Sequence, residues 1–350
     1  MGELDIKEYD ILQGDCKEVL RTLPDDCVDM CVTSPPFFGL RAYGDAEGEI
    51  GRETLPLDFV KSLAEVFHEV HRVLKPTGTL WLNLGDTYNG TKTGNTEIYK
   101  NPKLAATSDG IHKKEWKGLP PKSLIGIPWR VAFALQDDGW ILRSDIIWAK
   151  ANALPESVED RVSKSHEYLF MFSKIPSGYY FDYKSIEERI EGADENPTDG
   201  EPNTNCLFGA DDGFPEEADV KHQKKDPAHY KNLHEDEKGQ TNHSFHKSRA
   251  EGIPDAKYQM RRKRDVWNVP TRGYAEAHFA TYPEELIRPC ILAGCPKGGI
   301  VLDPFNGAAT TGVVALKNRR RYLGIELYPK YIEISRRRIA KETAQQTFDF

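Results

Sequence analysis

The 350-residue chain is 39% hydrophobic and 29% charged, with a formal net charge of -8. This length suits one large domain or two smaller ones, and the composition excludes a wholly disordered chain. No apolar run reaches about 18 residues and no apolar stretch follows Met1, so we expect neither a membrane span nor secretion. Six cysteines without a CxxC pair are typical of free thiols in a reducing cytoplasm.

Predicted strands and helices alternate through the first half of the chain. Apolar runs of strand length lie at 9–12, 28–32, 79–85, 140–150 and 167–174. Apolar residues with helical spacing occur at 17–23, 128–138 and 57–75, and we expect Pro76 and Gly78 to end the last of these helices. The alternation predicts an α/β fold with a mostly parallel sheet. No long helix separates the last two strands, so we expect an antiparallel pair at a sheet edge.

Polar segments interrupt this alternation. Residues 86–121 predict a long mobile loop, in which lysines and aromatic residues suit a segment that orders on DNA; a plain disordered insertion is an equal alternative. Residues 187–220 hold twelve acidic residues against one basic residue, whereas 221–264 hold twelve lysines or arginines against six acidic residues. The five histidines of 221–264 lack a common zinc-ligand spacing, so we expect no metal site.

The strand and helix pattern resumes near residue 278. We expect a helix at 283–293, strands at 298–303 and 320–327, and a basic helix at 328–343. Between them, the small-residue loop 303–311 leads from a strand into a helix, where unpaired backbone amides can bind an anion.

Glu326 ends the strand that follows this loop, and a carboxylate there can accept both hydroxyls of a ribose. Ligands of open α/β sheets bind at the carboxyl ends of the strands, so loop and carboxylate together predict a nucleoside site. The loop lacks a GxGxxG motif, which makes a dinucleotide a weaker candidate.

A second loop that could bind a ligand is Thr33-Ser34-Pro35-Pro36-Phe37. Consecutive prolines end the strand and leave carbonyl groups without amide partners. With the Ser34 hydroxyl, these carbonyls form a set of acceptors beside the Phe37 ring. Such a set suits a planar ring that carries an NH2 group, although a strand-ending turn without a ligand is the equal alternative for this motif alone.

Taken together, the two loops are similar to the motifs of the amino-methylating DNA methyltransferases, which use S-adenosyl-L-methionine. VTSPPF at 32–37 resembles the catalytic motif in its cytosine-N4 form, and DPFNGAATT at 303–311 resembles the cofactor loop. Further cofactor segments are matched by GDC (14–16), GIEL (324–327) and HFATYPEELI (278–287). The catalytic motif precedes the cofactor loop, as in the permuted beta class. The resemblance implies a Rossmann-like methyltransferase fold in which the strands before Asp15 and after Arg320 are neighbours.

The resemblance assigns a role to each matching residue. The catalytic residues are Ser34, Pro35, Pro36 and Phe37: the serine hydroxyl and the Pro35 carbonyl hold the amino hydrogens of the target base, and Phe37 stacks on its ring. The cofactor-binding residues are Asp15, Cys16, Phe279, Pro283, Asp303, Pro304, Phe305, Gly307, Thr310, Thr311 and Glu326. Ala309 stands where the family often has glycine, so we expect this loop to bend slightly differently. Cys290 lacks the Pro-Cys-Gln context of the ring-carbon methylases and is expected to be a buried small residue.

The family arrangement also divides the chain. We expect a catalytic half at 1–186, an inserted target-recognition and DNA-contact region at 187–277, and a cofactor-binding half at 278–345. In the insert, Arg261, Arg262, Lys263 and Arg264 form a natural phosphate footprint, with a solvated charged loop as the alternative.

The activity implied is site-specific methylation of the exocyclic amino group of a flipped base in double-stranded DNA. The serine in the motif favours cytosine-N4 over adenine-N6, which stays the main alternative. A non-catalytic DNA-binding protein with this fold is a distant alternative, as is a methylase of RNA or protein amides. We expect a cytoplasmic protein of bacterial, archaeal or phage origin. The recognition sequence, a cognate restriction endonuclease and the choice between monomer and homodimer are left open.

Overall fold

The computed structural model describes residues 4–39, 49–90, 116–153, 155–189, 260–272 and 281–344. The chain forms two compact units, one of Met1–Glu187 with Arg262–Phe350 and one of Glu188–Arg261. In the second unit, the described residues form an antiparallel ribbon of β6 (Glu188–Arg189) and β7 (Met260–Arg261).

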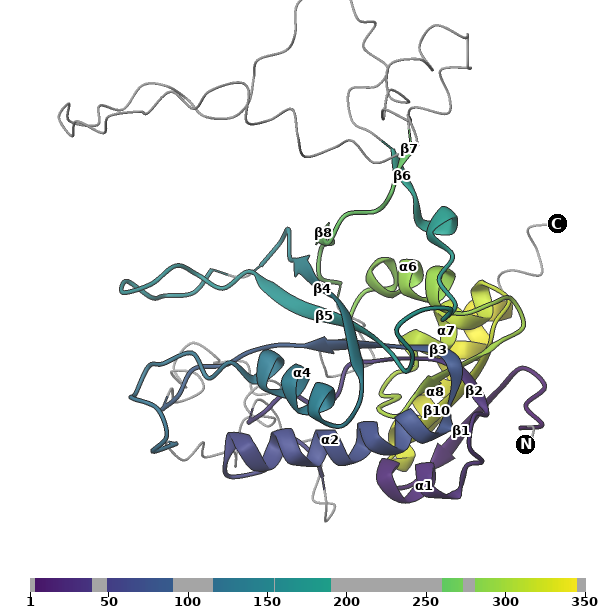
Figure 1. The fold of residues 1–350 in the computed structure, drawn as a ribbon, viewed down its shortest axis with the longest axis horizontal. Coiled ribbons are helices and arrows are strands. Elements are labelled where there is room, and N and C mark those ends of the chain that lie inside the picture. The colour runs from purple at the N-terminus through teal and green to yellow at the C-terminus, as the bar shows by residue number, and fades with distance from the viewer. Residues whose placement is uncertain are drawn as a thin grey trace, which may run out of the picture. The chain divides into compact units, whose positions relative to one another are not determined.

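An eight-stranded sheet forms the centre of the first unit (Figure 1). Its order is β1-β10-β9-β2-β3-β5-β4-β8, and all neighbours are parallel except the two pairs that include β5. The strands are β1 (Tyr9–Gln13), β2 (Val28–Thr33), β3 (Leu74–Leu84), β4 (Ile141–Ala149), β5 (His166–Ser173), β8 (Val266–Asn268), β9 (Ile300–Asp303) and β10 (Arg321–Glu326). This topology confirms the mostly parallel α/β fold. The parallel pairing of β1 with β10 also confirms the predicted neighbours.

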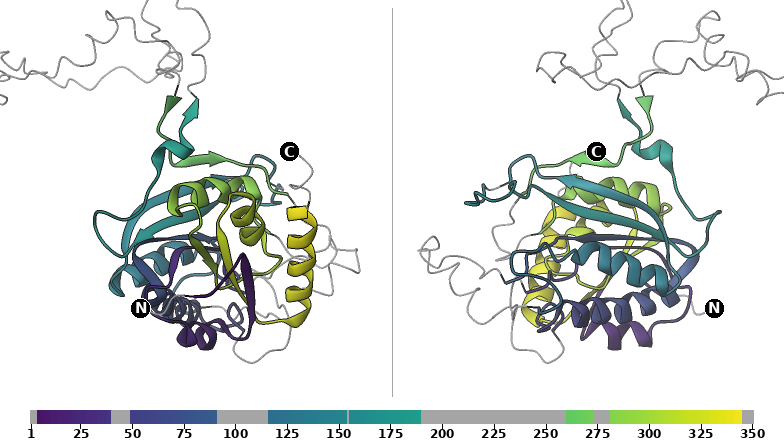
Figure 2. Two further views of the ribbon diagram at one scale, coloured as in Figure 1. Left: turned by 90° about the vertical axis from the view of Figure 1, so that its right-hand side faces the viewer. Right: turned by 60° about the vertical axis from the view of Figure 1, so that its left-hand side comes forward.

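Helices cover both faces of the sheet (Figures 1 and 2). One face carries α1 (Cys16–Thr22), α2 (Pro56–Val73) and α4 (Ile127–Asp137), and the other carries α6 (Glu284–Gly294), α7 (Thr310–Lys317) and α8 (Pro329–Ala344). A short 3-10 helix, η1 (Tyr183–Ile186), precedes β6. Each face has its own apolar core, and most residues of the central strands are buried.

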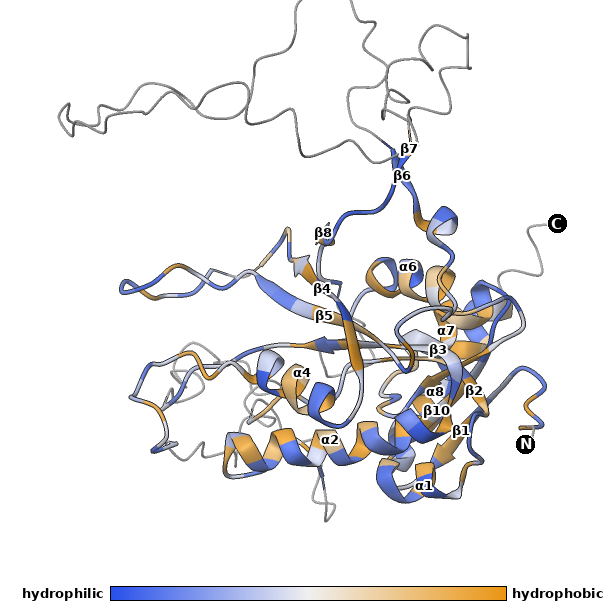
Figure 3. Ribbon diagram, viewed as in Figure 1, coloured by the Kyte–Doolittle hydropathy of each residue, from blue (hydrophilic) through white to orange (hydrophobic). Residues whose placement is uncertain are grey.

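Helix α2 shows how the sequence pattern builds one of these layers. Hydrophobic and hydrophilic residues alternate along it (Figure 3), and its apolar positions recur every three or four residues. The side chains of Phe59, Leu63, Phe67 and Val70 are fully buried against the sheet. Burial of each such side chain contributes about 1.5–3 kcal/mol, so this face alone fixes the helix on the sheet.

Three features differ from the sequence-based expectations. Strand β3 begins at Leu74, before Pro76 and Gly78, because a bulge between its pairs with Val28 and Met30 accommodates the proline. The antiparallel strand β5 lies third from the end of the sheet, because β4 and β8 pair beyond it. Strand β8 was not predicted: it has only three residues, of which only Trp267 is buried.

Candidate active site

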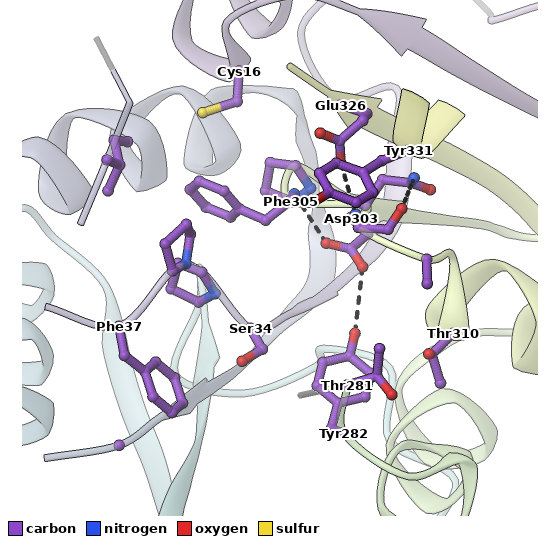
Figure 4. A pocket seen from close by; sticks show the side chains of 18 of the residues that line it. Cys16, Ser34, Phe37, Thr281, Tyr282, Asp303, Phe305, Thr310, Glu326 and Tyr331 are labelled. Carbon is purple, nitrogen blue, oxygen red and sulfur yellow. Dashed lines mark hydrogen bonds between the residues drawn. The ribbon is translucent and has the colours of Figure 1, made fainter. Parts of the chain in front are cut away.

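A cavity of about 490 Å³ lies at one edge of the central sheet. Its walls come from the carboxyl ends of β1, β10, β9, β2, β3 and β4, and from the amino end of the antiparallel β5. This is the position at which open α/β sheets bind ligands. Figure 4 shows the Ser34 and Phe37 side chains on one side of this cavity, and Asp303, Phe305 and Glu326 on another.

The predicted catalytic loop follows β2 and lines the cavity with all four of its residues. The Ser34 hydroxyl donates a hydrogen bond to Asn83 Oδ1 over 3.0 Å. The Phe37 ring packs on Gly85, where an added Cβ atom would lie only 2.6 Å from Phe37 Cε2. Glycine at position 85 therefore leaves the space that the Phe37 ring occupies beside the end of β3.

Asp303 is a buried carboxylate that accepts several hydrogen bonds behind the cavity. Its carboxylate accepts hydrogen bonds from the Thr33 and Thr311 hydroxyls, at 2.5 and 2.6 Å, and from the Phe305 amide at 3.0 Å. The Tyr282 hydroxyl adds a bond of 3.3 Å (Figure 4). Burial raises the pKa of this carboxyl, although the hydrogen bonds from the threonines oppose the rise. Asp303 thus links the end of β2, the loop 303–311 and the residue Tyr282 that precedes α6.

Glu326 ends β10 and is almost completely buried. Its two oxygens accept the amides of Gly307 at 2.8 Å and Tyr328 at 3.0 Å. Burial raises the pKa of Glu326 from 4.5 to about 7. A carboxylate with this geometry retains lone pairs for further donors from the cavity, as a ribose requires.

The loop that begins at Asp303 turns through two left-handed residues. Gly307 has φ +51° and Ala309 has φ +57°, and Ala309 directly precedes α7. Alanine does not avoid a positive φ here, contrary to what its usual preference predicts, because Ala309 adopts the left-handed conformation. Its buried methyl group packs in the core under α7, which offsets part of the cost of about 1–2 kcal/mol for this conformation.

The cavity brings together most of the predicted cofactor-binding residues. Those that line it are Asp15, Cys16, Asp303, Pro304, Phe305, Gly307, Thr310 and Glu326. Pro283 and Thr311 do not line it: Pro283 is buried at the start of α6, and Thr311 donates to Asp303. Phe279 lies outside the described residues. Asp15 caps α1 by accepting from the Lys17 amide at 2.8 Å, so one of its oxygens is engaged in the fold.

The thiols agree with the expectations from the sequence. The five cysteines among the described residues are free and buried, and Cys290 is fully buried as expected. Burial raises the pKa of the Cys16 thiol to about 12, so this thiol stays protonated beside the cavity. Cys206 and the five histidines of 221–264 lie outside the described residues. The described ranges contain no group of three or more His, Cys, Asp or Glu side chains that could hold a metal ion.

A polar wall of the cavity was missed from the sequence. It comprises Asp86, Lys150, Glu156, Lys164, His166 and Glu167. Lys150 and Glu167 form an ion pair, and Lys164 Nζ donates to the Asp86 carbonyl over 2.6 Å. The available signal was the charged ends of the two apolar strands β4 and β5, which become adjacent only because the strands pair antiparallel. Tyr282, Tyr328 and Tyr331 were missed as well.

The predicted phosphate contacts flank the boundary between the two units. In the second unit, Arg261 forms an ion pair with Glu188 at 2.9 Å. In the first unit, Arg262 lies over the Tyr183 ring at 4.9 Å and Lys263 over the Trp267 ring at 4.9 Å. Of the predicted loop 86–121, residues 91–115 lie outside the described part. Its two flanks are joined by Asn89, whose side chain bonds the Trp116 and Leu119 carbonyls.

Comparison with known families agrees with this geometry. Residues 28–337, which include both motif loops, match the family model of the N6/N4 DNA methylases, described as DNA methylase. The chain belongs to this family. It is a DNA amino-methyltransferase of the type found in type II systems, and S-adenosyl-L-methionine is its cofactor. No helix in the described ranges is both long and apolar enough to span a bilayer.

Relatives in the family match over nearly the whole chain. The type II methyltransferase M.Cfr9I of Citrobacter freundii is 40% identical over 97% of this chain and 90% of its own. M.SmaI of Serratia marcescens is 38% identical over 97% of this chain and 93% of its own. The similarity therefore extends over nearly the full length of both relatives.

Solved structures share the fold at lower identity. PvuII DNA methyltransferase (cytosine-N4-specific) aligns with a TM-score of 0.56 and 17% identity over 97% of this chain and 93% of its own. TTHA0409 of Thermus thermophilus, complexed with S-adenosyl-L-methionine, aligns with a TM-score of 0.52 and 21% identity over 96% of each chain. These similarities establish the Rossmann-like methyltransferase fold.

Proposed function

We propose that this DNA methylase transfers the methyl group of S-adenosyl-L-methionine to N4 of a cytosine flipped out of double-stranded DNA. The observation that carries the proposal is the Ser34-Pro35-Pro36-Phe37 loop, which lines the same cavity as Asp303, Gly307 and Glu326. A base on one side and a nucleoside cofactor on the other would meet within this single space.

The cofactor side of the cavity fits a nucleoside that carries an amino-acid arm. Glu326 would accept the ribose hydroxyls, and the carboxylate of the arm would lie at the start of α7, near Gly307 and Thr310. Asp15 would accept from the adenine amino group with the carboxylate oxygen that does not cap α1. The bound cofactor supplies an electrophilic methyl group attached to a sulfonium.

The base side requires groups that prepare an amino nitrogen for attack. The lone pair of an exocyclic amine is delocalised into the ring, so the amine is a weak nucleophile. The Ser34 hydroxyl and the Pro35 carbonyl would accept its two hydrogens out of the ring plane, which concentrates electron density on nitrogen. Phe37 would stack on the flipped base, an interaction worth about 1–3 kcal/mol.

The polar wall of the cavity supports cytosine as the target. Cytosine presents two acceptors, N3 and O2, on the same edge as its amino group. Lys164 and His166 line the cavity and carry donors that suit such acceptors. Adenine presents only N1 on the edge that carries its amino group, so two neighbouring donors on this wall favour cytosine.

The remaining assignments are proposals of the same kind. Residues 187–277 would read the target sequence, and Arg261, Arg262, Lys263 and Arg264 would contact phosphates. The protein would act in the cytoplasm on double-stranded DNA, and the presence of a cognate restriction endonuclease is left open.

Methyl transfer to mixed-sequence duplex DNA, followed by mass spectrometry of the nucleosides, tests the proposal. We expect N4-methylcytosine from the wild-type protein and strongly reduced product from Ser34→Ala, with S-adenosyl-L-methionine affinity nearly unchanged. N6-methyladenine as the product would show that the target base is adenine and not cytosine. Wild-type turnover in Ser34→Ala would refute the role of the serine.

A further inference from the structure

A row of polar side chains lies behind Ser34. The Ser34 hydroxyl donates to Asn83 Oδ1 at 3.0 Å, and Asn83 Nδ2 donates to Glu167 Oε2 at 3.1 Å. The other oxygen of Glu167 accepts from Lys150 Nζ in a close ion pair. These residues come from four places in the chain: the loop after β2, the strands β3 and β5, and the residue after β4.

The orientation of the Asn83 amide follows from its neighbours. Its NH2 group faces two acceptors, the Glu167 carboxylate and the Tyr168 carbonyl, both at 3.1 Å. The reverse orientation would place Oδ1 against these two oxygens. Asn83 is only 2% exposed, so water cannot compensate for such a mismatch. Asn83 must therefore present its oxygen to Ser34.

The direction of the Ser34 hydroxyl follows in turn. With its hydrogen committed to Asn83 Oδ1, the serine oxygen faces the cavity with lone pairs only. An amino group that enters the cavity then meets an acceptor and no competing donor. Lys150 completes the row, because an ammonium group only donates and so keeps the second Glu167 oxygen as an acceptor.

We infer that the Lys150–Glu167 ion pair is a positioning device: it acts through Asn83 to hold Ser34 as a hydrogen-bond acceptor for the target amino group. The inference rests on the proposed function, since it requires that Ser34 contacts the base. It adds to that function two charged residues that need not touch the base and that the catalytic motif does not contain.

The Glu167→Gln variant tests the inference, because it keeps the shape of the side chain and changes its polarity. Lys150 would retain the glutamine oxygen, so the glutamine NH2 would face Asn83 Nδ2. To avoid two opposed donors, Asn83 would turn over, lose its bond to the Tyr168 carbonyl and donate to Ser34, which blocks a lone pair meant for the base. We expect single-turnover methyl transfer at saturating cofactor to slow by roughly a hundredfold, as for other misplaced reacting groups. Cofactor affinity by calorimetry should stay within about twofold.

The matched control is Glu69→Gln on α2. Glu69 is similarly shielded and paired with Arg72 at 2.8 Å, but it lies outside the cavity lining. It should leave the rate unchanged. Equal rates for Glu167→Gln and wild type would overturn the inference.

Two double variants separate this role from a structural one. If Glu167 acts through Ser34, Glu167→Gln should cause no further decrease in rate in a Ser34→Ala background; an equal decrease in both backgrounds would overturn the inference. The double variant Asn83→Asp/Glu167→Gln restores a hydrogen-bond acceptor at position 83 that faces Ser34. It also supplies a donor from position 167 to position 83. It should be at least about tenfold faster than Glu167→Gln alone, and additive decreases would contradict the proposed polarity.

The same measurements distinguish a failure of the proposed function from a failure of this inference. Wild-type rates in Ser34→Ala would refute the catalytic role of the serine, and the inference with it. A slow Ser34→Ala variant combined with a fast Glu167→Gln variant would refute the inference alone.

Discussion

Glu326 offers a test in which the size of the effect follows from the structure. Burial raises the pKa of this carboxyl from 4.5 to about 7, so the folded protein holds a proton that the unfolded chain has already released between these values. In this window the free energy of unfolding should fall by up to about 1.4 kcal/mol per pH unit. The stabilisation is complete below pH 4.5 and lost above pH 7. The total decrease is about 3 kcal/mol for a difference of about 2.5 between the two pKa values.

The Glu326→Gln variant provides the reference for this titration. Glutamine cannot ionise, so the contribution of position 326 to the pH dependence should disappear. One of the amides of Gly307 and Tyr328 would face the new NH2 group, which costs about 1–3 kcal/mol at every pH and leaves the slope unaffected. The difference between wild-type and variant curves therefore isolates the ionisation of Glu326.

Urea unfolding of the cofactor-free protein at pH 5, 6, 7 and 8 measures both curves. Affinity for S-adenosyl-L-methionine should rise with pH over the same range in the wild-type protein only, because ribose hydroxyls and a positive sulfonium both favour the ionised carboxylate. A constant difference between the two unfolding curves would refute the raised pKa. A pH-independent wild-type affinity would refute the ribose contact.

Three further predictions follow from the site and its surroundings. Gly85→Ala should displace the Phe37 ring and slow methyl transfer as strongly as Phe37→Ala, with cofactor affinity unchanged; a fully active Gly85→Ala variant would contradict the packing of that ring. Ala309→Gly should change the free energy of unfolding by less than about 1 kcal/mol, because relief of the left-handed alanine is offset by removal of the buried methyl group; a decrease above about 2 kcal/mol in denaturant titration would be inconsistent. Neutralising residues 261–264 should reduce the slope of log DNA affinity against log salt concentration by about 0.9 for each phosphate contact that is lost. Since Arg261 is paired with Glu188, we expect the loss of fewer than four such contacts. An unchanged slope would mean that other residues contact the phosphates.

The sequence was most informative for helices and strands whose hydrophobic pattern lies within a single segment of the chain. The apolar period of α2 and the buried runs of β2, β9 and β10 predicted these elements to within a few residues. The two motif loops predicted a shared cavity, because the carboxyl ends of parallel strands meet at one edge of a sheet.

Features that depend on tertiary partners could not be predicted in this way. Strand β8 has only three residues, too few for a recognisable pattern, and it forms by pairing with the edge that β4 offers. The ion pair of Lys150 with Glu167 depends on the antiparallel register of β4 and β5, and local sequence does not encode that register. The conformation of Ala309 was misjudged because propensity disfavours it, whereas the packing under α7 holds it in place.

The pairing of β1 with β10 has a consequence for the newly synthesised chain. Strand β1 leaves the ribosome about 310 residues before its partner β10, since Tyr9 pairs opposite Tyr322. At about 5–20 residues per second, β1 waits roughly 15–60 s with its backbone donors and acceptors unpaired. Throughout this interval it is an unpaired strand, whose free backbone groups can pair with other chains. Removal of β10 and the residues after it would make that exposure permanent, so truncated chains should aggregate instead of remaining as inactive monomers.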